Sequence, residues 1–179
     1  MKGVVFTEFL EMVEKEFGFV ILDKLITETP EASNEGYTAV GTYSYEEFVA
    51  LLINLSKETK ISIEDLTKAF GTYLFGYFVK RYAHMLNNIN TTFELLDKLE
   101  SYIHVEVRKL YSDAELPYFE TISMNKKHMV LHYKSKRRMA SFAEGLINAA
   151  ATHFEEDIHV EKEYLHEDGS WVSFILDKK

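Results

Sequence analysis

The stretch YFETISMNKKHMVLHYKSKR, residues 118–137, decides the fold class of this chain. Within residues 128–133, Met, Leu and Tyr alternate with His, Val and His, which is the period of a β-strand. Residues 118–124 form a matching run, and Asn125 and Lys126 separate the two. The stretch therefore predicts a β-hairpin, and it marks the point where a helical pattern gives way to a sheet.

Helical signals dominate the chain before this hairpin. Apolar residues recur at helical spacing over residues 5–13, 48–55 and 66–78. Helix-start signals are found at Ser44 with Glu47, Ser62 with Asp65, and Thr91 with Glu94. The helix that begins at Thr91 is predicted to continue through His104. These patterns predict a helical lobe in the first part of the chain.

The remaining segments complete an α+β prediction. Residues 30–43 are rich in Gly, Ser and Thr and predict a loop, whereas residues 139–150 return to a helical stripe. Residues 158–164 and 171–176 flank the turn pair Asp168–Gly169 and predict two further strands. We therefore expect an N-terminal helical lobe followed by a mostly antiparallel four-stranded sheet with one inserted helix.

Composition limits the possible functions. The 179 residues, 46% of them hydrophobic, are expected to form one domain over residues 1–179, with subdomains at 1–60 and 61–179. The absence of cysteine excludes disulfides, a thiolate nucleophile and Cys-based zinc or iron–sulfur sites. The net charge of −9 argues against a nucleic-acid partner. Residues 1–17 contain several glutamates and form no signal peptide or membrane span, so we expect a cytoplasmic protein without membrane contact.

Three polar side chains at the end of the second predicted strand favour a site for carboxylates. Tyr133, Ser135 and Arg137 offer two hydroxyls and a guanidinium, a combination that suits a pair of carboxylates. Haem carries two such groups, its propionates, and the helical His104 can supply an axial nitrogen to its iron. On spacing alone, a solvated strand edge and a structural histidine are commoner uses of these residues.

Five segments, spread in order along essentially the whole chain, carry a family resemblance. They are residues 1–3, 69–71 and 104–111, Pro117, and the Tyr-x-Ser-x-Arg run at 133–137. Together they resemble the bacterial stand-alone members of the H-NOX family, the haem nitric oxide/oxygen binding domains related to the sensor domain of soluble guanylate cyclase. The Tyr-x-Ser-x-Arg run with an upstream histidine is the specific part of the resemblance.

This resemblance implies that haem b (iron protoporphyrin IX) lies between the two lobes. It implies that His104 is the iron ligand and that the Tyr-x-Ser-x-Arg run clamps the propionates. It further implies that Pro117 presses on the porphyrin and helps to set its distortion. Three apolar residues are implied to pack its distal side: Val5, Phe78 and Leu146.

The resemblance also predicts which gas is bound. Oxygen-binding members carry a distal Tyr donor, supported by a Trp in the first helix and an Asn shortly after the glycine that corresponds to Gly71. The matching positions here are Phe142, Phe9 and Leu74, which all lack a donor. The resemblance therefore implies a sensor selective for nitric oxide over dioxygen. An inward hydroxyl of Tyr73 or Tyr77, on the same helix as Leu74, would weaken this exclusion.

The implied output is a signal rather than catalysis. In the switch proposed for the family, nitric oxide weakens or releases the bond from iron to His104, and the helix that bears His104 then shifts. A separate partner, such as a histidine kinase or a cyclic-di-GMP enzyme, would detect the shift. Carbon monoxide is a further candidate ligand. The sequence has no phosphate loop, nucleophile elbow or dinucleotide-binding glycine pattern, so no enzyme is predicted.

Three other interpretations stay open at the level of sequence. One is an oxygen-binding haem sensor with an unrecognised distal Tyr donor. Another is a module of the same fold that binds a different apolar ligand. The last is a peroxidase-like haem enzyme, which would need a distal acid or base that Phe9, Leu74 and Phe142 do not offer.

Overall fold

The computed structural model describes residues 1–30, 32 and 36–179, so part of the predicted loop at 30–43 lies outside the described residues. The chain begins with helices α1 (Gly3–Phe17), α2 (Phe19–Thr27), α3 (Tyr45–Thr59) and α4 (Ile63–Arg81). Next come a 3-10 turn η1 (Ala83–Leu86), α5 (Thr92–Asp97), a π turn η2 (Leu99–Ile103) and α6 (His104–Leu110). Strands β1 (Tyr118–Met124) and β2 (His128–Lys134), helix α7 (Ala140–His153), and strands β3 (Ile158–Tyr164) and β4 (Trp171–Lys178) complete it.

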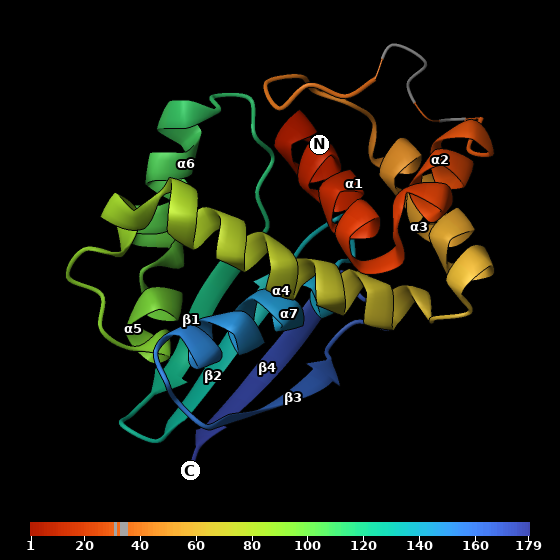
Figure 1. Ribbon diagram of the computed structural model, residues 1–179. Helices are drawn as coiled ribbons and strands as arrows, with labels where there is room; N and C mark the ends of the chain where they lie inside the picture. Colours follow the sequence, from red (N-terminus) through yellow and green to blue (C-terminus); the bar gives the residue numbers. More distant parts are fainter. Residues whose placement is uncertain (31, 33–35) are drawn as a thin grey trace.

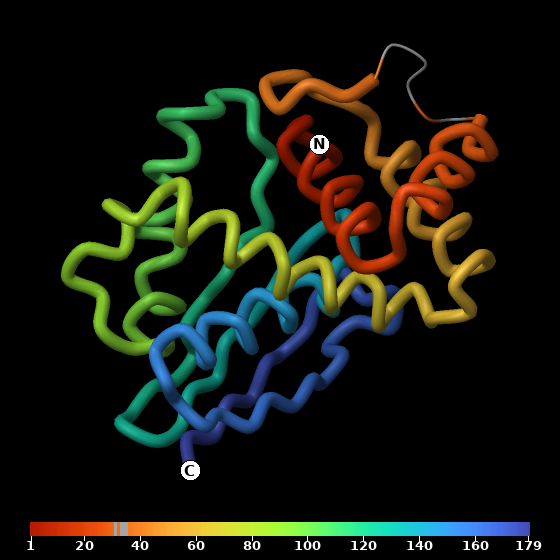
Figure 2. Tube along the Cα trace, viewed as in Figure 1, coloured from red at the N-terminus to blue at the C-terminus, as the bar shows by residue number. Residues whose placement is uncertain are grey.

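The arrangement confirms the predicted α+β class. Helices α1, α2 and α3 lie on one side of the molecule, and α5 and α6 lie on the other. Helix α4 extends from one of these sides to the other (Figure 1). Helix α7 lies between α4 and the sheet (Figure 1). The Cα trace leaves α6 and passes beside the start of α1 before it enters β1 (Figure 2). None of the helices in the described ranges has an apolar stretch long enough to cross a membrane.

The sheet presents one buried face to the rest of the molecule. In the described part of the chain its strands are all antiparallel and follow the order β1-β2-β4-β3. Because side chains alternate along a strand, every second residue of β2 turns inward. Met129, Leu131 and Tyr133 are these inward residues, with Leu131 opposite Phe174 and Tyr133 opposite Val172 on β4. Tyr133 thereby arrives at the inner face at the end of its strand.

Two glycines allow α4 and α7 to cross at close range. A Cβ atom on Gly71 would lie 2.2 Å from the carbonyl oxygen of Phe142, and one on Gly145 would lie 2.0 Å from that of Lys68. Real Cβ atoms do not approach so closely, so any larger residue would force the helices apart. The crossing fixes how residues 74, 142 and 146 lie relative to one another.

Ion pairs to the buried carboxylate of Glu144 support the same crossing. The Glu144 carboxylate on α7 is paired with Lys68 on α4, and its Oε2 atom lies 2.7 Å from Lys162 Nζ on β3. Burial raises the pKa of Glu144, but hydrogen bonds from Lys162 and Lys68 outweigh this effect and hold the pKa below its usual value. One carboxylate thus joins two helices and the edge strand.

The N-terminal lobe has an aromatic core. The ring of Phe9 meets those of Phe48 and Phe70 in edge contacts at centroid distances of 5.1 and 5.2 Å. The predicted capping box is present, since Glu47 N donates to Ser44 Oγ over 3.1 Å and Ser44 N donates to Glu47 Oε1 over 3.2 Å. Helix α4 lies beyond residue 60 and still contributes Phe70 to this core. The predicted subdomain boundary at residue 60 stays a prediction.

The helix that carries His104 differs from the prediction. Instead of one helix from Thr91 onward, the chain forms α5, the π turn η2 and then α6. Within η2 the amide of Ile103 donates to the carbonyl of Lys98 over 3.1 Å, five residues back. Such wide turns inside helices are frequent at functional sites. Here the π turn lies immediately before His104.

Candidate functional site

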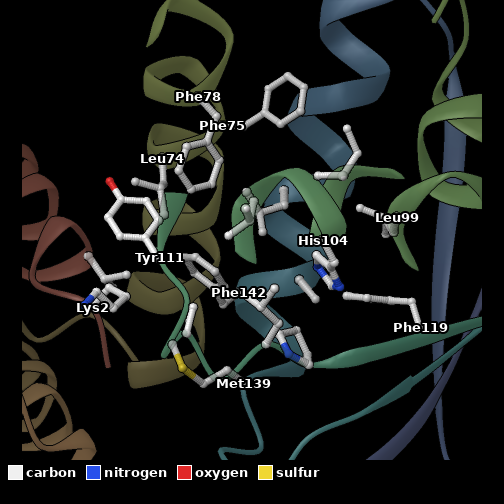
Figure 3. Close-up of a pocket in the computed structure, with 18 of the residues that line it drawn as sticks. Lys2, Leu74, Phe75, Phe78, Leu99, His104, Tyr111, Phe119, Met139 and Phe142 are labelled. Atoms are coloured by element: carbon white, nitrogen blue, oxygen red, sulfur yellow. The ribbon is translucent and has the colours of Figure 1, made fainter. Parts of the chain in front are cut away.

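A cavity of about 450 Å³ lies between the N-terminal lobe, α6 and the inner face of the sheet. Side chains from α1, α4, α6, α7, the loop at residues 111–117 and the end of β2 line it. Its lining is mainly apolar, as expected for a site that holds a small organic molecule. Figure 3 shows His104 and Phe142 extending into this space from different helices.

One side of the cavity is an apolar wall built by α1, α4 and α7. We define this apolar wall as Val5, Leu74, Phe78, Phe142 and Leu146, which all line the cavity. Leu74 is almost fully buried, and the Phe142 ring lies 5.4 Å from that of Phe70 behind it. These side chains carry no hydroxyl, amide or charge. The wall therefore offers a guest only van der Waals contact.

Phe9 occupies a different place from the other predicted site residues. It is fully buried in the N-terminal lobe and is not among the residues that line the cavity. Its ring contacts Phe70, which in turn contacts Phe142. Phe9 thus lies one layer behind the apolar wall, and the Phe70 ring links it to Phe142.

The hydroxyls of Tyr73 and Tyr77 do not belong to the cavity lining. Tyr73 faces α1: its burial, followed by the charge and hydrogen bonding of Glu11, raises the pKa of Tyr73 to about 12. Burial and then the charge of Glu8 likewise raise the pKa of Tyr77. Both rings therefore lie near the acidic side chains of α1.

A tyrosine pair at the edge of the cavity was not foreseen from the sequence. Tyr82 and Tyr111 both line the cavity, and their hydroxyl oxygens lie 3.1 Å apart. Burial, together with the hydrogen bond to Tyr111, raises the pKa of Tyr82. Figure 3 shows the hydroxyl of Tyr111 directed away from His104. No sequence signal links these two residues, since they come from the end of α4 and the end of α6.

His104 is buried at the first position of α6 and lines the cavity. Its Nδ1 atom lies 2.7 Å from Glu100 Oε1. An ionised carboxylate can only accept, so Nδ1 carries the proton and the Nε2 lone pair of a neutral ring is free. Burial lowers the pKa of His104, against the opposing effect of Glu100, and favours this neutral form. In the described part of the chain, Nε2 has no hydrogen-bond partner.

Three further polar residues of the cavity come from the end of β2 and the turn that follows it. We define the polar wall as His104, Tyr133, Ser135 and Arg137, which all line the cavity, as does Pro117. The Tyr133 hydroxyl accepts a hydrogen bond from the amide of Met139 over 3.0 Å. The Ser135 hydroxyl accepts one from the amide of Arg137 over 3.2 Å. The predicted Tyr-x-Ser-x-Arg residues are thus brought together at the same cavity as His104.

The guanidinium of Arg137 already holds a carboxylate. Its Nη2 atom lies 2.9 Å from Glu115 Oε2, and Nη1 donates to the Glu115 carbonyl over 2.7 Å. The Glu115 side chain is 85% exposed, so its carboxylate can move away from Arg137 without disturbing the fold. A guest with a carboxylate of its own can therefore take that place on Arg137. Sequence reasoning missed Glu115, because an acidic residue in a loop gives no distinctive signal.

These observations fit a haem. A buried imidazole nitrogen without a partner faces an apolar cavity, and a guanidinium and two hydroxyls lie on its rim. Among the described residues, no group of three or more His, Asp or Glu side chains could hold a bare metal ion. A single protein nitrogen suits the axial position of an iron whose equatorial ligands come from a porphyrin.

Comparisons with known proteins agree with this fit. A sequence model of the family described as haem-NO-binding matches residues 2–162. A comparison with curated proteins gave no match. Among solved structures, the ferrous unliganded H-NOX protein from K. algicida is 40% identical, covers 100% of this chain and 97% of its own, and has a TM-score of 0.95.

Two Shewanella structures extend the comparison to bound gases. The H-NOX protein from Shewanella woodyi, solved with IWP-051 in the ferrous carbon monoxide state, is 37% identical, with coverages of 100% and 95% and a TM-score of 0.85. The protein from S. oneidensis in the ferrous nitric oxide state is 26% identical, with coverages of 100% and 99% and a TM-score of 0.91.

Proposed function

The chain belongs to the haem-NO-binding (H-NOX) family, whose members are gas-sensing haem domains, and from this premise we propose that it senses nitric oxide and excludes dioxygen. The observation that carries the proposal is the apolar wall, which contains no hydrogen-bond donor. A hydrogen-bond donor favours dioxygen because dioxygen takes up negative charge from ferrous haem, whereas nitric oxide has little need of a donor. The lack of a donor thus favours nitric oxide.

The cofactor we propose is haem b, held by residues of both walls. His104 would bind the iron through Nε2, and Arg137 with Tyr133 and Ser135 would bind the propionates. Pro117 and the apolar wall would pack against the ring faces. Phe9 would act indirectly, since the Phe70 ring lies between it and Phe142.

The proposed signal starts at His104 and leaves through the loop at residues 111–117. This loop follows α6 and is tied to the N-terminal lobe, because Asp113 accepts from Lys2 Nζ over 3.1 Å and from the Thr42 hydroxyl over 3.0 Å. A weaker bond between the iron and His104 would move α6, and these contacts would transmit the movement to α1. For this to signal, a partner must bind one of the two states more tightly.

The proposed partner is a separate protein, either a histidine kinase or a cyclic-di-GMP enzyme. Nitric oxide is the proposed physiological ligand, and carbon monoxide a second one. The relatives with nitric oxide and carbon monoxide bound support the gas assignment.

The test is the visible absorption spectrum of the ferrous protein without oxygen, repeated after addition of nitric oxide, carbon monoxide and, separately, air. We expect haem bands that shift with nitric oxide and carbon monoxide, and no stable dioxygen complex. A protein without haem bands after expression with sufficient haem would contradict the proposal and favour a different apolar ligand.

A second candidate function, an oxygen-binding sensor, is favoured by one observation. In the pair of Tyr82 and Tyr111, one hydroxyl proton is used between the two oxygens and the other is free to donate. A stable dioxygen complex that is lost in Tyr111→Phe would establish this function. Persistence of such a complex in both Tyr111→Phe and Tyr82→Phe would exclude the pair as its donor.

A further inference from the structure

The carboxylate of Glu100 makes three contacts at the back of His104. Its Oε1 atom lies 2.7 Å from His104 Nδ1 and accepts the backbone N–H of Phe119 over 3.1 Å. Its Oε2 atom lies 4.0 Å from Arg108 Nη2. Glu100 therefore joins the π turn, the first turn of α6 and the start of β1.

We propose that Glu100 is a positioning residue that sets how strongly His104 binds the haem iron, and thereby how readily nitric oxide releases it. The inference rests on the proposed function, because it requires His104 to be the iron ligand. Glu100 lies outside the cavity lining, and by this proposal it controls the response to nitric oxide through His104.

Glu100 first sets the orientation of the His104 ring. Because the carboxylate accepts from Nδ1–H, it fixes the imidazole tautomer and leaves Nε2 as the free nitrogen. The Phe119 amide holds the same carboxylate oxygen, so Glu100 cannot swing away without losing a second hydrogen bond. The His104 ring is thereby held in one orientation at the cavity.

The π turn contributes to this orientation. Glu100 lies within η2 and His104 directly follows it. Residues four apart also meet on a regular α-helix, so the contact between Glu100 and His104 does not itself require a wide turn. The π turn is the segment in which the same carboxylate also accepts from the Phe119 amide, nineteen residues further along the chain, and so ties His104 to β1.

Glu100 also changes the electron density on the His104 ring. A carboxylate that accepts from Nδ1–H draws the proton toward itself and makes the opposite nitrogen a stronger ligand. The side chains of His104 and Glu100 are only 9% and 26% exposed, so water competes little for this hydrogen bond. Hydrogen bonds to a charged acceptor are also about twice as strong as neutral ones. Removal of the charge should therefore weaken the bond from His104 to iron.

A purely structural role for Glu100 makes a different prediction. If Glu100 only ties η2 to β1, Glu100→Gln should preserve its function, because the glutamine oxygen can still accept from Phe119 and His104. If Glu100 tunes the imidazole, the same substitution should alter the iron–histidine bond while the fold stays intact. The iron–histidine stretching frequency separates the two roles.

The first experiment is resonance Raman spectroscopy of the ferrous haem-loaded protein. We expect the iron–histidine stretch to fall from wild type to Glu100→Gln and further to Glu100→Ala, and haem affinity to fall about 10–100-fold in Glu100→Ala. Glu106→Gln is the matched control, since Glu106 is paired with Lys109 and not with His104. Unchanged frequencies in both Glu100 variants, with His104 still the ligand, would overturn the inference.

A second experiment covers the case in which the Glu100 variants lose haem. In His104→Gly protein, added imidazole can donate a hydrogen bond to Glu100, whereas 1-methylimidazole cannot. We expect imidazole to bind the iron about 10-fold or more tightly than 1-methylimidazole, and this preference to shrink when Glu100→Gln is added. Equal affinities would contradict the role of Glu100. Retention of the wild-type axial ligand in His104→Gly would instead contradict the proposed function.

Discussion

The two walls of the cavity are built in opposite ways. The apolar wall comes from the interior of regular helices, and glycine at positions 71 and 145 holds α4 and α7 together. The polar wall comes from a helix start and a strand end, and its neighbours Glu100 and Glu115 hold its polar atoms in place. The apolar wall therefore acts through shape and the polar wall through directed chemistry, so substitutions in the two should have different kinds of effect.

The largest effect is expected from the polar wall, in His104→Gly. Removal of the imidazole takes away the proposed iron ligand altogether, so the axial histidine signal should vanish from the ferrous resonance Raman spectrum. Added imidazole should restore it, because the cavity keeps its shape. His84→Gly, at an exposed position, is the control and should behave as wild type. An unchanged spectrum in His104→Gly would mean that the polar wall does not hold the iron.

The next effect concerns the apolar wall, in Phe142→Tyr. The added hydroxyl places a donor on a wall that has none, and a hydrogen bond to a charged acceptor contributes about 1.5–3 kcal/mol. Dioxygen affinity should therefore rise by about 10-fold or more, as measured by absorption titration of the ferrous protein.

Phe9→Tyr is the matched control for this change. Phe9 lies behind the wall, so its new hydroxyl would be buried without reaching the cavity. It should cost about 1–3 kcal/mol of stability and leave dioxygen affinity unchanged. A gain in dioxygen affinity from Phe9→Tyr alone would show that the apolar wall extends deeper than its lining residues.

A smaller effect is expected from Arg137→Ala. Loss of the guanidinium removes the charged, cavity-lining side chain of the Tyr-x-Ser-x-Arg run, and haem should bind about 10-fold more weakly. Transfer of haem to an acceptor protein measures this change. Lys136→Ala, at the exposed neighbouring position, should leave transfer unchanged. Equal transfer rates in the two variants would indicate that the polar wall holds haem through His104 alone.

The contrast between the walls also explains what could be read from the sequence. Strands and helix starts follow from local patterns, so the hairpin at 118–134 and the cap at Ser44 were predicted correctly. The π turn could not be predicted, because residues 92–110 continue a helical pattern and the turn is held by the distant amide of Phe119. Contacts across the chain set such features, and one sequence does not show them.

The positions of the site residues, too, were predictable only where local sequence determines them. A matching position in a family motif places a residue on a helix, but side-chain packing decides whether it reaches a cavity. Leu74 and Phe142 line the cavity, whereas Phe9 lies behind it. The pair of Tyr82 and Tyr111 likewise joins two helix ends that only the folded chain brings together.

The last expected effect is on stability rather than on ligand binding, and it tests the glycines that hold the apolar wall. In Gly145→Ala the new Cβ would lie 2.0 Å from the Lys68 carbonyl oxygen, so α4 and α7 must separate, at a cost of about 1–3 kcal/mol. Gly76→Ala on the same α4 helix has no atom within 4 Å of its new Cβ and should instead stabilise by about 0.5–1 kcal/mol. Urea unfolding measures both. Opposite signs would locate the constraint at the helix crossing, whereas equal stabilisation by both would mean that the crossing does not fix the wall.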